Sequence, residues 1–341
     1  LSTRASGRSA HLLTRAEDTG AQPAAALLRE ALGSAGASVT VDESAFRQAL
    51  DQPGIYFDYH RLLPVSVLSE QYGISFDPQF QARCLLLSVG EGDVVQLYFW
   101  DGESTVQRYE PAVSASDVSD AIASFETNGA YFAYEGGEEL SHLSPYAILC
   151  PAARDTYLVT SSIPSALDMD SLLERLDFNP HTHSRYPEAD GTEVVVETPR
   201  TLRVQPDGTV IYTGGAEAAS DLYHVNAANT LPTEVEAVLA VRQLLEVLLS
   251  GEDLGDGQIY FSGVSASGDQ MQVTFDYMVD GVPVYFSDGS SAMEVQITGT
   301  TITAFRLQSR QYTLSETAYS LLPLPQALAA ASLYEGGCLT I

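Results

Sequence analysis

Residues 258–312 carry the longest uninterrupted alternation of strand and turn signals in the chain, QIYFSGVSASGDQMQVTFDYMVDGVPVYFSDGSSAMEVQITGTTITAFRLQSRQY. Val273, Phe275 and Tyr277 alternate with polar residues, which is the period of two of a half-buried strand. Asp280-Gly281 follows and favours a two-residue hairpin turn, because both residues readily adopt positive φ. Alternating runs at 293–298 and 302–307 complete the pattern of an antiparallel meander.

A helix just upstream, over residues 233–250, is expected to cover one face of this meander. Thr233 and Glu236 have the spacing of a capping box, and Gly251 suits the end of the helix. The stripe that we expect to be buried consists of Val235, Val238, Leu239, Leu245 and Leu248. Together with a second helical pattern at 323–333, the order of elements predicts an α+β fold.

Composition limits the possible partners and reactions. The 341 residues include 16 basic and 45 acidic ones, a formal charge of −29, and 45% are hydrophobic. Such a charge repels phosphate backbones and anionic headgroups, which argues against a nucleic acid partner. All the basic residues are arginine, so neither a lysine Schiff base nor a P-loop lysine is available.

The cysteines and the ends of the chain say less about function. Cys84, Cys150 and Cys338 lie far apart in apolar surroundings and are interpreted as small buried hydrophobes. The longest apolar runs are far shorter than the roughly 18 residues of a membrane helix. Because the sequence starts at Leu1 and not at methionine, we expect that a signal or anchor segment has been removed from its front.

Strand and helix signals further along the chain suggest a multi-domain protein in which antiparallel sheets are each covered by helices. We predict an N-terminal α+β domain over 1–165, a middle domain of a helix and hairpins over 166–222, and a C-terminal domain of a helix and a meander over 223–341. The first boundary rests on the change in composition at 161–165, which is typical of a linker.

His181 and His183 form the best metal candidate, with Glu188 and Asp190 nearby. Two histidines at i and i+2 of a strand face the same side and could ligate zinc together with a carboxylate. The alternative is a polar loop after a helix, and it is favoured because no third ligand stands at a recognised spacing. We therefore predict no catalytic, metal or cofactor site.

Three other patterns have simpler explanations than a functional site. The acidic run 252–257 lacks the alternating carboxylates of a calcium-binding loop and reads as a solvated connection. The run 288–291 reads as a turn between strands, since no nucleophile motif surrounds its serines. Asp58 and His60, which are the ingredients of an acid–base pair, more simply flank the end of a strand.

Three stretches resemble the YycH/YycI family of extracytoplasmic regulatory proteins. They are IYFDYHRLLPVSVLSEQYGI at 55–74, LLERLDFNPHTHSRYPEADGTEVVVETPRTLRVQPDGTVIYTG at 172–214 and FDYMVDGVPVYFSDGSSAMEVQITGTTITAFRLQSRQYTL at 275–314. The last contains the D-G-x-P-V turn between two strands that the family shares in part with PepSY-like modules. One departure is that the chain ends at 338–341, where the family leads us to expect another strand, so the C-terminal domain is expected to be incomplete.

The resemblance implies a non-catalytic regulator anchored by an N-terminal transmembrane helix outside the cytoplasmic membrane of a Gram-positive bacterium. Its implied partner is the membrane sensor histidine kinase of the two-component system that governs the cell wall, with a related family member as a further implied partner. The alternative is an extracytoplasmic binding module for a peptide, a wall fragment or a metal. A deep pocket with convergent polar groups would favour the module, and an exposed, tyrosine-rich surface would favour the regulator.

Overall fold

The computed structural model describes residues 2–4, 8–10, 22–76, 78, 80–141, 143–149, 156–164, 169–181, 184–217, 219–319 and 324–331. These residues form a mixed α+β structure with four antiparallel sheets, the largest of which has nine strands. The prediction of an α+β fold built on antiparallel sheets is thereby confirmed.

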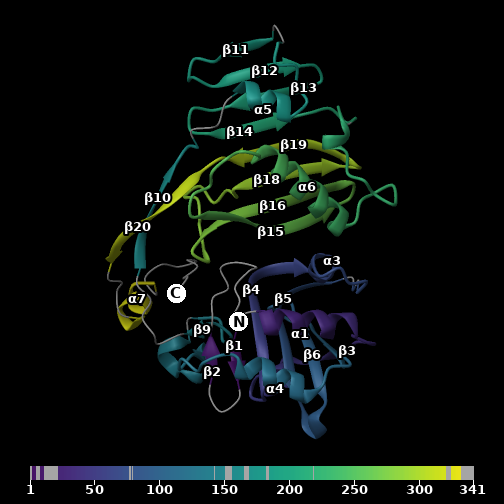
Figure 1. Cartoon of the computed structure of the whole chain (residues 1–341), viewed down its shortest axis with the longest axis vertical. Helices are drawn as coiled ribbons and strands as arrows, with labels where there is room; N and C mark the ends of the chain where they lie inside the picture. Colours follow the sequence, from purple (N-terminus) through teal and green to yellow (C-terminus); the bar gives the residue numbers. More distant parts are fainter. Residues whose placement is uncertain are drawn as a thin grey trace. The chain divides into compact units, whose positions relative to one another are not determined.

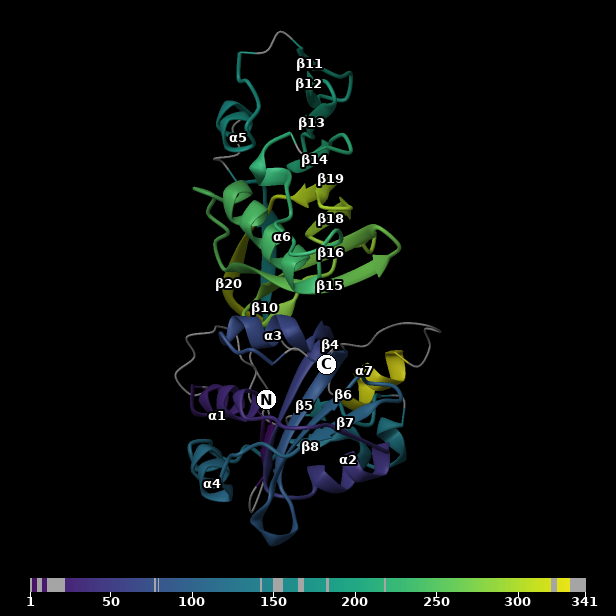
Figure 2. The ribbon, with the colours of Figure 1, turned by 90° about the vertical axis from the view of Figure 1, so that its right-hand side faces the viewer.

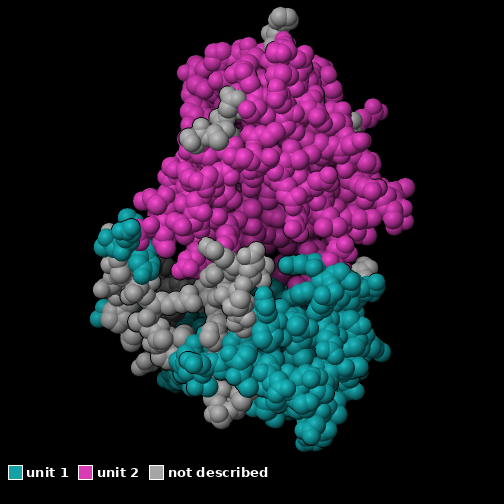
Figure 3. Space-filling model, viewed as in Figure 1, with its two compact units in different colours: residues 1–62, 71–158, 316–341 teal, residues 63–70, 159–315 magenta. Residues whose placement is uncertain are grey.

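The chain divides into two compact units, shown in different colours in Figure 3. The first contains residues 1–62, 71–158 and 316–341, and the second contains 63–70 and 159–315. The second unit thus takes in the predicted middle segment and most of the predicted C-terminal segment. The domain boundaries at 165 and 222 stay predictions, since compactness alone does not define a domain.

The first unit is organised around a seven-stranded sheet. In spatial order its strands are β2 (Arg8–Ala10), β1 (Ser2–Arg4), β4 (Gly54–Pro64), β5 (Gln81–Val89), β6 (Val95–Trp100), β7 (Val106–Tyr109) and β3 (Val39–Val41). Its helices are α1 (Gln22–Gly33), α2 (Glu43–Leu50), α4 (Ala115–Ala123) and α7 (Leu324–Ala331). Two short strands, β8 (Tyr131–Phe132) and β9 (Ile148–Leu149), pair separately, and 3₁₀ turns lie at 91–93, 133–135 and 138–140.

Helices cover both faces of this sheet, with α1 and α4 on one side and α2 on the other (Figure 2). Phe46 of α2 packs with Tyr98 and Trp100, which share one face of the sheet with Cys84. Leu85 and Leu87 point to the opposite face and are also buried. Burial on both sides explains why the central strands read as continuous apolar runs without alternation.

The second unit is organised around the nine-stranded sheet (Figure 1). Its main strands, in spatial order, are β11 (Arg185–Pro187), β12 (Glu193–Glu197), β13 (Arg200–Val204), β14 (Thr209–Thr213), β19 (Thr301–Gln308), β18 (Met293–Thr298), β16 (Gln270–Val279) and β15 (Gly257–Ser267). The short strand β17 (Val282–Pro283) pairs with the end of β16. The helices are α3 (Val65–Gln71), α5 (Met169–Arg175) and α6 (Glu234–Leu248), with a 3₁₀ turn at 221–223.

One face of this sheet is buried beneath α5 and α6, and the other is open to solvent (Figure 2). On the open face, Gln272, Gln296 and Thr213 are exposed although all three of their strands lie in the interior of the sheet. The buried face is crossed by a row of residues paired from strand to strand: Val264, Val273, Val295, Phe305, Tyr212, Leu202 and Val195. The alternation in 258–312 therefore predicts the sheet faces correctly.

Helix α6 begins and ends as predicted, but its buried stripe differs from the prediction. Thr233 Oγ1 accepts the backbone N–H of Glu236, and the Glu236 carboxylate accepts the N–H of Thr233, which completes a capping box. Leu239 is 42% exposed and Val235 is half-buried, so their assignment to the core is wrong. Three residues at helical spacing from one another replace them in the core: Ala237, Val241 and Leu244.

The Asp280-Gly281 hairpin is confirmed, since both residues have positive φ, of 49° and 74°. The strand after the turn is shorter than expected. β17 pairs with β16 only through Val282 and Pro283, after which Val284 and Phe286 turn in to pack beside Tyr277. Pro283 lies opposite Met278 and removes no ladder bond, since the next residue, Val284, still donates its N–H to Tyr277 O at 2.8 Å.

A two-stranded ribbon is formed by β10 (Thr156–Ser162) and β20 (Gln311–Tyr319), visible at the left of Figure 1. Thr160 Oγ1 donates to the carbonyl of Thr313 across the ribbon, at 3.5 Å. The opposite edge of β20 is occupied at Tyr312, whose N–H donates to Leu254 O and whose carbonyl accepts the N–H of Asp256. Ser161 and Ser162, within the stretch interpreted as a linker, belong to this paired strand, in which the chain passes from the first unit to the second.

Candidate functional site

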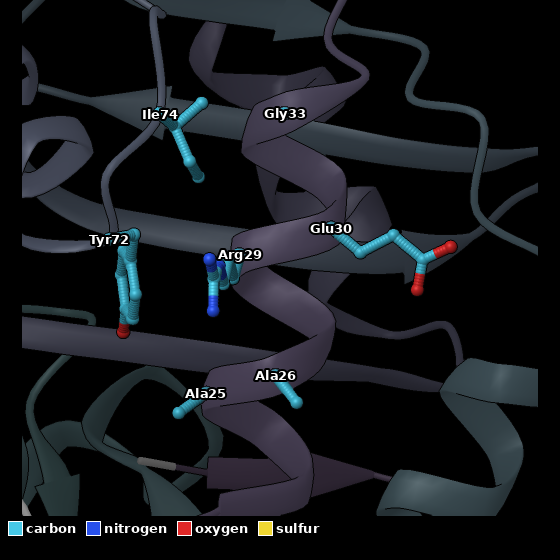
Figure 4. Close-up of a pocket in the computed structure, with 7 residues that line it drawn as sticks. All are labelled: Ala25, Ala26, Arg29, Glu30, Gly33, Tyr72 and Ile74. Carbon is cyan, nitrogen blue, oxygen red and sulfur yellow. The ribbon is translucent and has the colours of Figure 1, made fainter.

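A hollow of about 530 Å³ lies beside α1 in the first unit. Its lining is mainly apolar, from Ala25, Ala26, Gly33, Tyr72 and Ile74. Arg29 and Glu30 also line it but project to opposite sides of the helix (Figure 4). Burial raises the pKa of Tyr72 above the ordinary value of a phenol. The hollow thus provides apolar contact without convergent polar groups.

The predicted metal candidate is only partly within the described residues. His181 is exposed in a turn, and its backbone N–H donates to Asn179 Oδ1 at 3.0 Å, while His183 lies outside the described part. The nearby carboxylates have protein partners: Glu188 accepts Nη1 of Arg203 at 2.8 Å, and Asp190 accepts the N–H of Thr192. The two-histidine site therefore stays a hypothesis with no third ligand assigned.

The acidic run 252–257 is a structural loop whose carboxylates bind protein groups. Glu252 pairs with Arg175 at 3.2 Å. Asp253 accepts the N–H of Gly255 and the side chain of Gln311, and Asp256 accepts the N–H of Leu314. In the part of the chain that the structure describes, no group of three His, Cys, Asp or Glu side chains could hold a metal ion.

The strand that contains Asp58 and His60 is β4, and here the acid is paired with a cation. Asp58 Oδ1 lies 3.5 Å from Nε of Arg83, on the neighbouring strand β5. The side chain of His60 lies outside the described part. Nearby, Tyr56 donates its hydroxyl to Sγ of Cys84 at 2.9 Å, and burial raises the pKa of the Cys84 thiol.

Cys84 is therefore a buried thiol as predicted, and burial keeps it in the unreactive protonated form. Cys150 and Cys338 lie outside the described residues. The serines at 288–291 are part of a turn, in which Asp288 Oδ1 accepts both the N–H and the hydroxyl of Ser290. This is an Asx turn, in line with the interpretation from sequence.

Most of the tyrosines that the structure describes serve packing. Buried tyrosines are Tyr56, Tyr98, Tyr109, Tyr146, Tyr212, Tyr223, Tyr277 and Tyr312. Tyr212 stacks between Tyr223 and Phe305, with ring centroids 4.5 and 5.1 Å apart. The clearly exposed ones are Tyr186, on the edge strand β11, and Tyr285, after β17, which pairs with β16. These two tyrosines therefore do not form one patch.

Exposed apolar side chains gather instead on β10. Leu158 and Val159 are 51% and 38% exposed, and Ile163, directly after the strand, is 42% exposed. The residues between them, Thr160 to Ser162, are exposed as well. The sequence predicts a strand at 157–160, since the run TYLVTSSI at 156–163 has β-branched residues and no charge. It does not predict that the side chains stay exposed, because exposure depends on the pairing of distant segments.

No helix in the described ranges is long and apolar enough to cross a membrane. Comparison with protein-family models, with curated proteins and with solved structures found no match to this chain. The family resemblance rests on the three sequence stretches quoted above.

Proposed function

We propose that this chain is a non-catalytic regulator that acts by binding another protein on the extracytoplasmic face of a cell membrane. The proposed partner is the sensor histidine kinase of a cell-wall two-component system. The YycH/YycI-like stretches at 55–74, 172–214 and 275–314 support this choice of partner. They also support an N-terminal membrane anchor ahead of the chain and a PepSY-like character for its C-terminal part.

The observation that carries a protein-binding role is the exposed apolar strand β10. Leu158, Val159 and Ile163 present side chains to solvent along one short segment. Single exposed apolar residues are ordinary, but Val159 and Ile163 lie on the same side of one uncharged segment, and neighbouring exposed apolar groups favour a surface for interaction. A docked protein would bury these groups and thereby gain about 25 cal/mol per Å² of apolar area removed from water.

Charge sets the character of the partner surface. A chain with a formal charge of −29 attracts a basic surface and repels an acidic one. Binding should therefore weaken as salt is raised, because exposed charges farther apart than about 8 Å are largely screened at physiological ionic strength. An affinity that does not change with salt would count against this part of the proposal.

The test is co-purification of the membrane-anchored protein from its own cells after cross-linking, compared with a form that lacks residues 1–341. Recovery of a sensor histidine kinase only when 1–341 is present supports the proposal. Recovery of no membrane protein contradicts it. If a small molecule or metal were retained instead, the binding-module alternative would replace it, and His181 and His183 would be the first residues to replace.

A further inference from the structure

Edge strands decide where another chain can add to a sheet, because they present unpaired backbone N–H and C=O groups. Most edges in the described part of this protein are protected. β2 and β3 are three residues long, and β11 contains Arg185 and Pro187. Short length, charge and proline each oppose the addition of a further strand.

Two longer edges contain no charged residue, β15 and β10. β15 has a bulge between Phe261 and Gly263, where the register to β16 shifts. A bulge bends an edge strand and interrupts its ladder, which blocks the approach of a regular partner strand. β10 contains no charged residue, and Pro164 follows the strand and removes none of its donors.

The ribbon leaves β10 as its open edge. β20 is bonded to β10 on one side and, at Tyr312, to the loop residues Leu254 and Asp256 on the other. No described residue pairs with the far edge of β10. From Val159 to Ile163, the part of this segment that belongs to the second unit, all side chains are exposed, so no described residue of that unit covers either face.

We propose that β10 receives an extended segment of the partner protein as an added antiparallel or parallel strand, with an uncharged centre and basic residues at its ends. This inference rests on the proposed function and names the surface that performs it. Backbone hydrogen bonds to the free edge would supply affinity, and apolar side chains would pack on Val159 and Ile163.

The chemistry of that segment follows from charge. The chain has a formal charge of −29, but β10 contains no charged residue. A strand that pairs with β10 therefore meets no charge directly opposite its own residues. Of the carboxylates near the ribbon, Asp207 lies beside Gly208 and Ile163 and 3.9 Å from the guanidinium of Arg310, and Asp253 binds Gln311 of β20. Basic residues flanking the incoming strand therefore match the net negative charge of the chain and not a free carboxylate at β10. A second copy of this chain would not match this charge, because it is itself strongly acidic.

The test uses a fluorescein-labelled peptide, Lys-Thr-Val-Thr-Val-Thr-Lys, titrated with the full chain and followed by anisotropy. Val159→Lys places a charge on the edge, which is how natural edges avoid pairing. Ser265→Lys adds the same charge to β15, at a position that is also exposed, and is the matched control. Thermal unfolding checks that both variants remain folded. A peptide with alternate backbone nitrogens methylated tests the need for strand hydrogen bonds.

We expect the peptide to bind the unaltered chain and Ser265→Lys within about twofold of each other, and Val159→Lys about tenfold more weakly or not at all. The methylated peptide should not bind. The inference is overturned if the unaltered chain does not bind the peptide, if both variants bind equally, or if methylation has no effect. Dimerisation of the chain itself through β10, seen in sedimentation and abolished by Val159→Lys, would also overturn it.

The same variants separate this inference from the proposed function. If the kinase co-purifies with the unaltered chain and equally with Val159→Lys, the regulator proposal stands and the β10 surface is wrong. If no kinase co-purifies with the unaltered chain, the regulator proposal fails, and the peptide titration alone decides whether β10 accepts a strand.

Discussion

Arg175 and Glu252 join the ends of two helices of the second unit, with Nη2 of Arg175 3.2 Å from Oε1 of Glu252. The Arg175 guanidinium also donates to the carbonyls of Leu248 and Ser250, at the C-terminal end of α6. The Glu252 side chain is only 1% exposed. One cation thus satisfies both the free carbonyls of a helix end and a buried carboxylate.

Replacing Arg175 with Met should destabilise the protein by about 3 kcal/mol, because it leaves the Glu252 carboxylate buried without a cation. Adding Glu252→Gln to that variant should recover part of the loss, since a neutral amide costs less to bury than a charge. Chemical denaturation of the single and double variants measures both effects. Equal stability of Arg175→Met and the unaltered chain would show that water reaches Glu252.

The two leucines of α6 that sequence analysis placed together should respond differently to truncation. Leu245→Ala should cost about 2–4 kcal/mol of unfolding free energy, because the side chain is buried in the main core of the second unit. Leu239→Ala should change stability by less than about 0.5 kcal/mol, since Leu239 is largely exposed. Comparable losses in a denaturation experiment would mean that another group covers Leu239.

Glu236 should make the stability of α6 dependent on pH. The backbone N–H groups of Thr233 and Ala228 bind its carboxylate and lower its pKa below the ordinary value of 4.5. Because the folded pKa lies below the unfolded one, its contribution is present above about pH 4.5 and is lost as pH falls through the folded pKa.

Glu236→Gln should therefore be less stable than the unaltered chain near pH 7, and the difference should shrink below about pH 4.5. Glu246→Gln is the control, because Glu246 lies on the exposed side of α6, 3.4 Å from Arg242. Thermal melts across this range measure the difference. If the difference in stability between Glu236→Gln and the unaltered chain stayed constant from neutral to acid pH, the capping carboxylate would be excluded as the source of that difference.

Gly255 should tolerate no side chain, because a Cβ there would lie 2.1 Å from the carbonyl oxygen of Tyr312. Its φ of 62° adds backbone strain for any other residue. Gly255→Ala should cost about 3 kcal/mol or more and loosen the loop that borders β20. Gly251 also has a positive φ, but open space surrounds it, so Gly251→Ala should cost only about 1 kcal/mol. Amide exchange at Tyr312 would report the loosening directly.

Local patterns predict much of this fold. The alternation at Val273, Phe275 and Tyr277, the capping box at Thr233 and the Asp280-Gly281 turn all have the expected structure. Each depends on residues within one element or one turn, where side-chain period and backbone φ determine the conformation. The error at Leu239 has a different cause, because the pattern allowed several apolar stripes and the facing sheet selected one.

Pairings between distant segments could not be read from local patterns. β14 pairs with β19 nearly a hundred positions later and so joins the predicted middle segment to the meander in one sheet. The pairing of β10 with β20 places Ser161 and Ser162, which were expected in a linker, in a strand. The candidate surface at Val159 depends on this long-range pairing, because exposure and a free edge are properties of the folded chain.

The most direct test of the regulatory account is the autophosphorylation rate of the co-purified sensor kinase in lipid vesicles, with increasing amounts of this chain added outside. The account predicts a saturable change in rate that Val159→Lys abolishes, that Ser265→Lys preserves and that high salt weakens. A rate that stays constant at every concentration of the chain, while the kinase itself remains active, would contradict it.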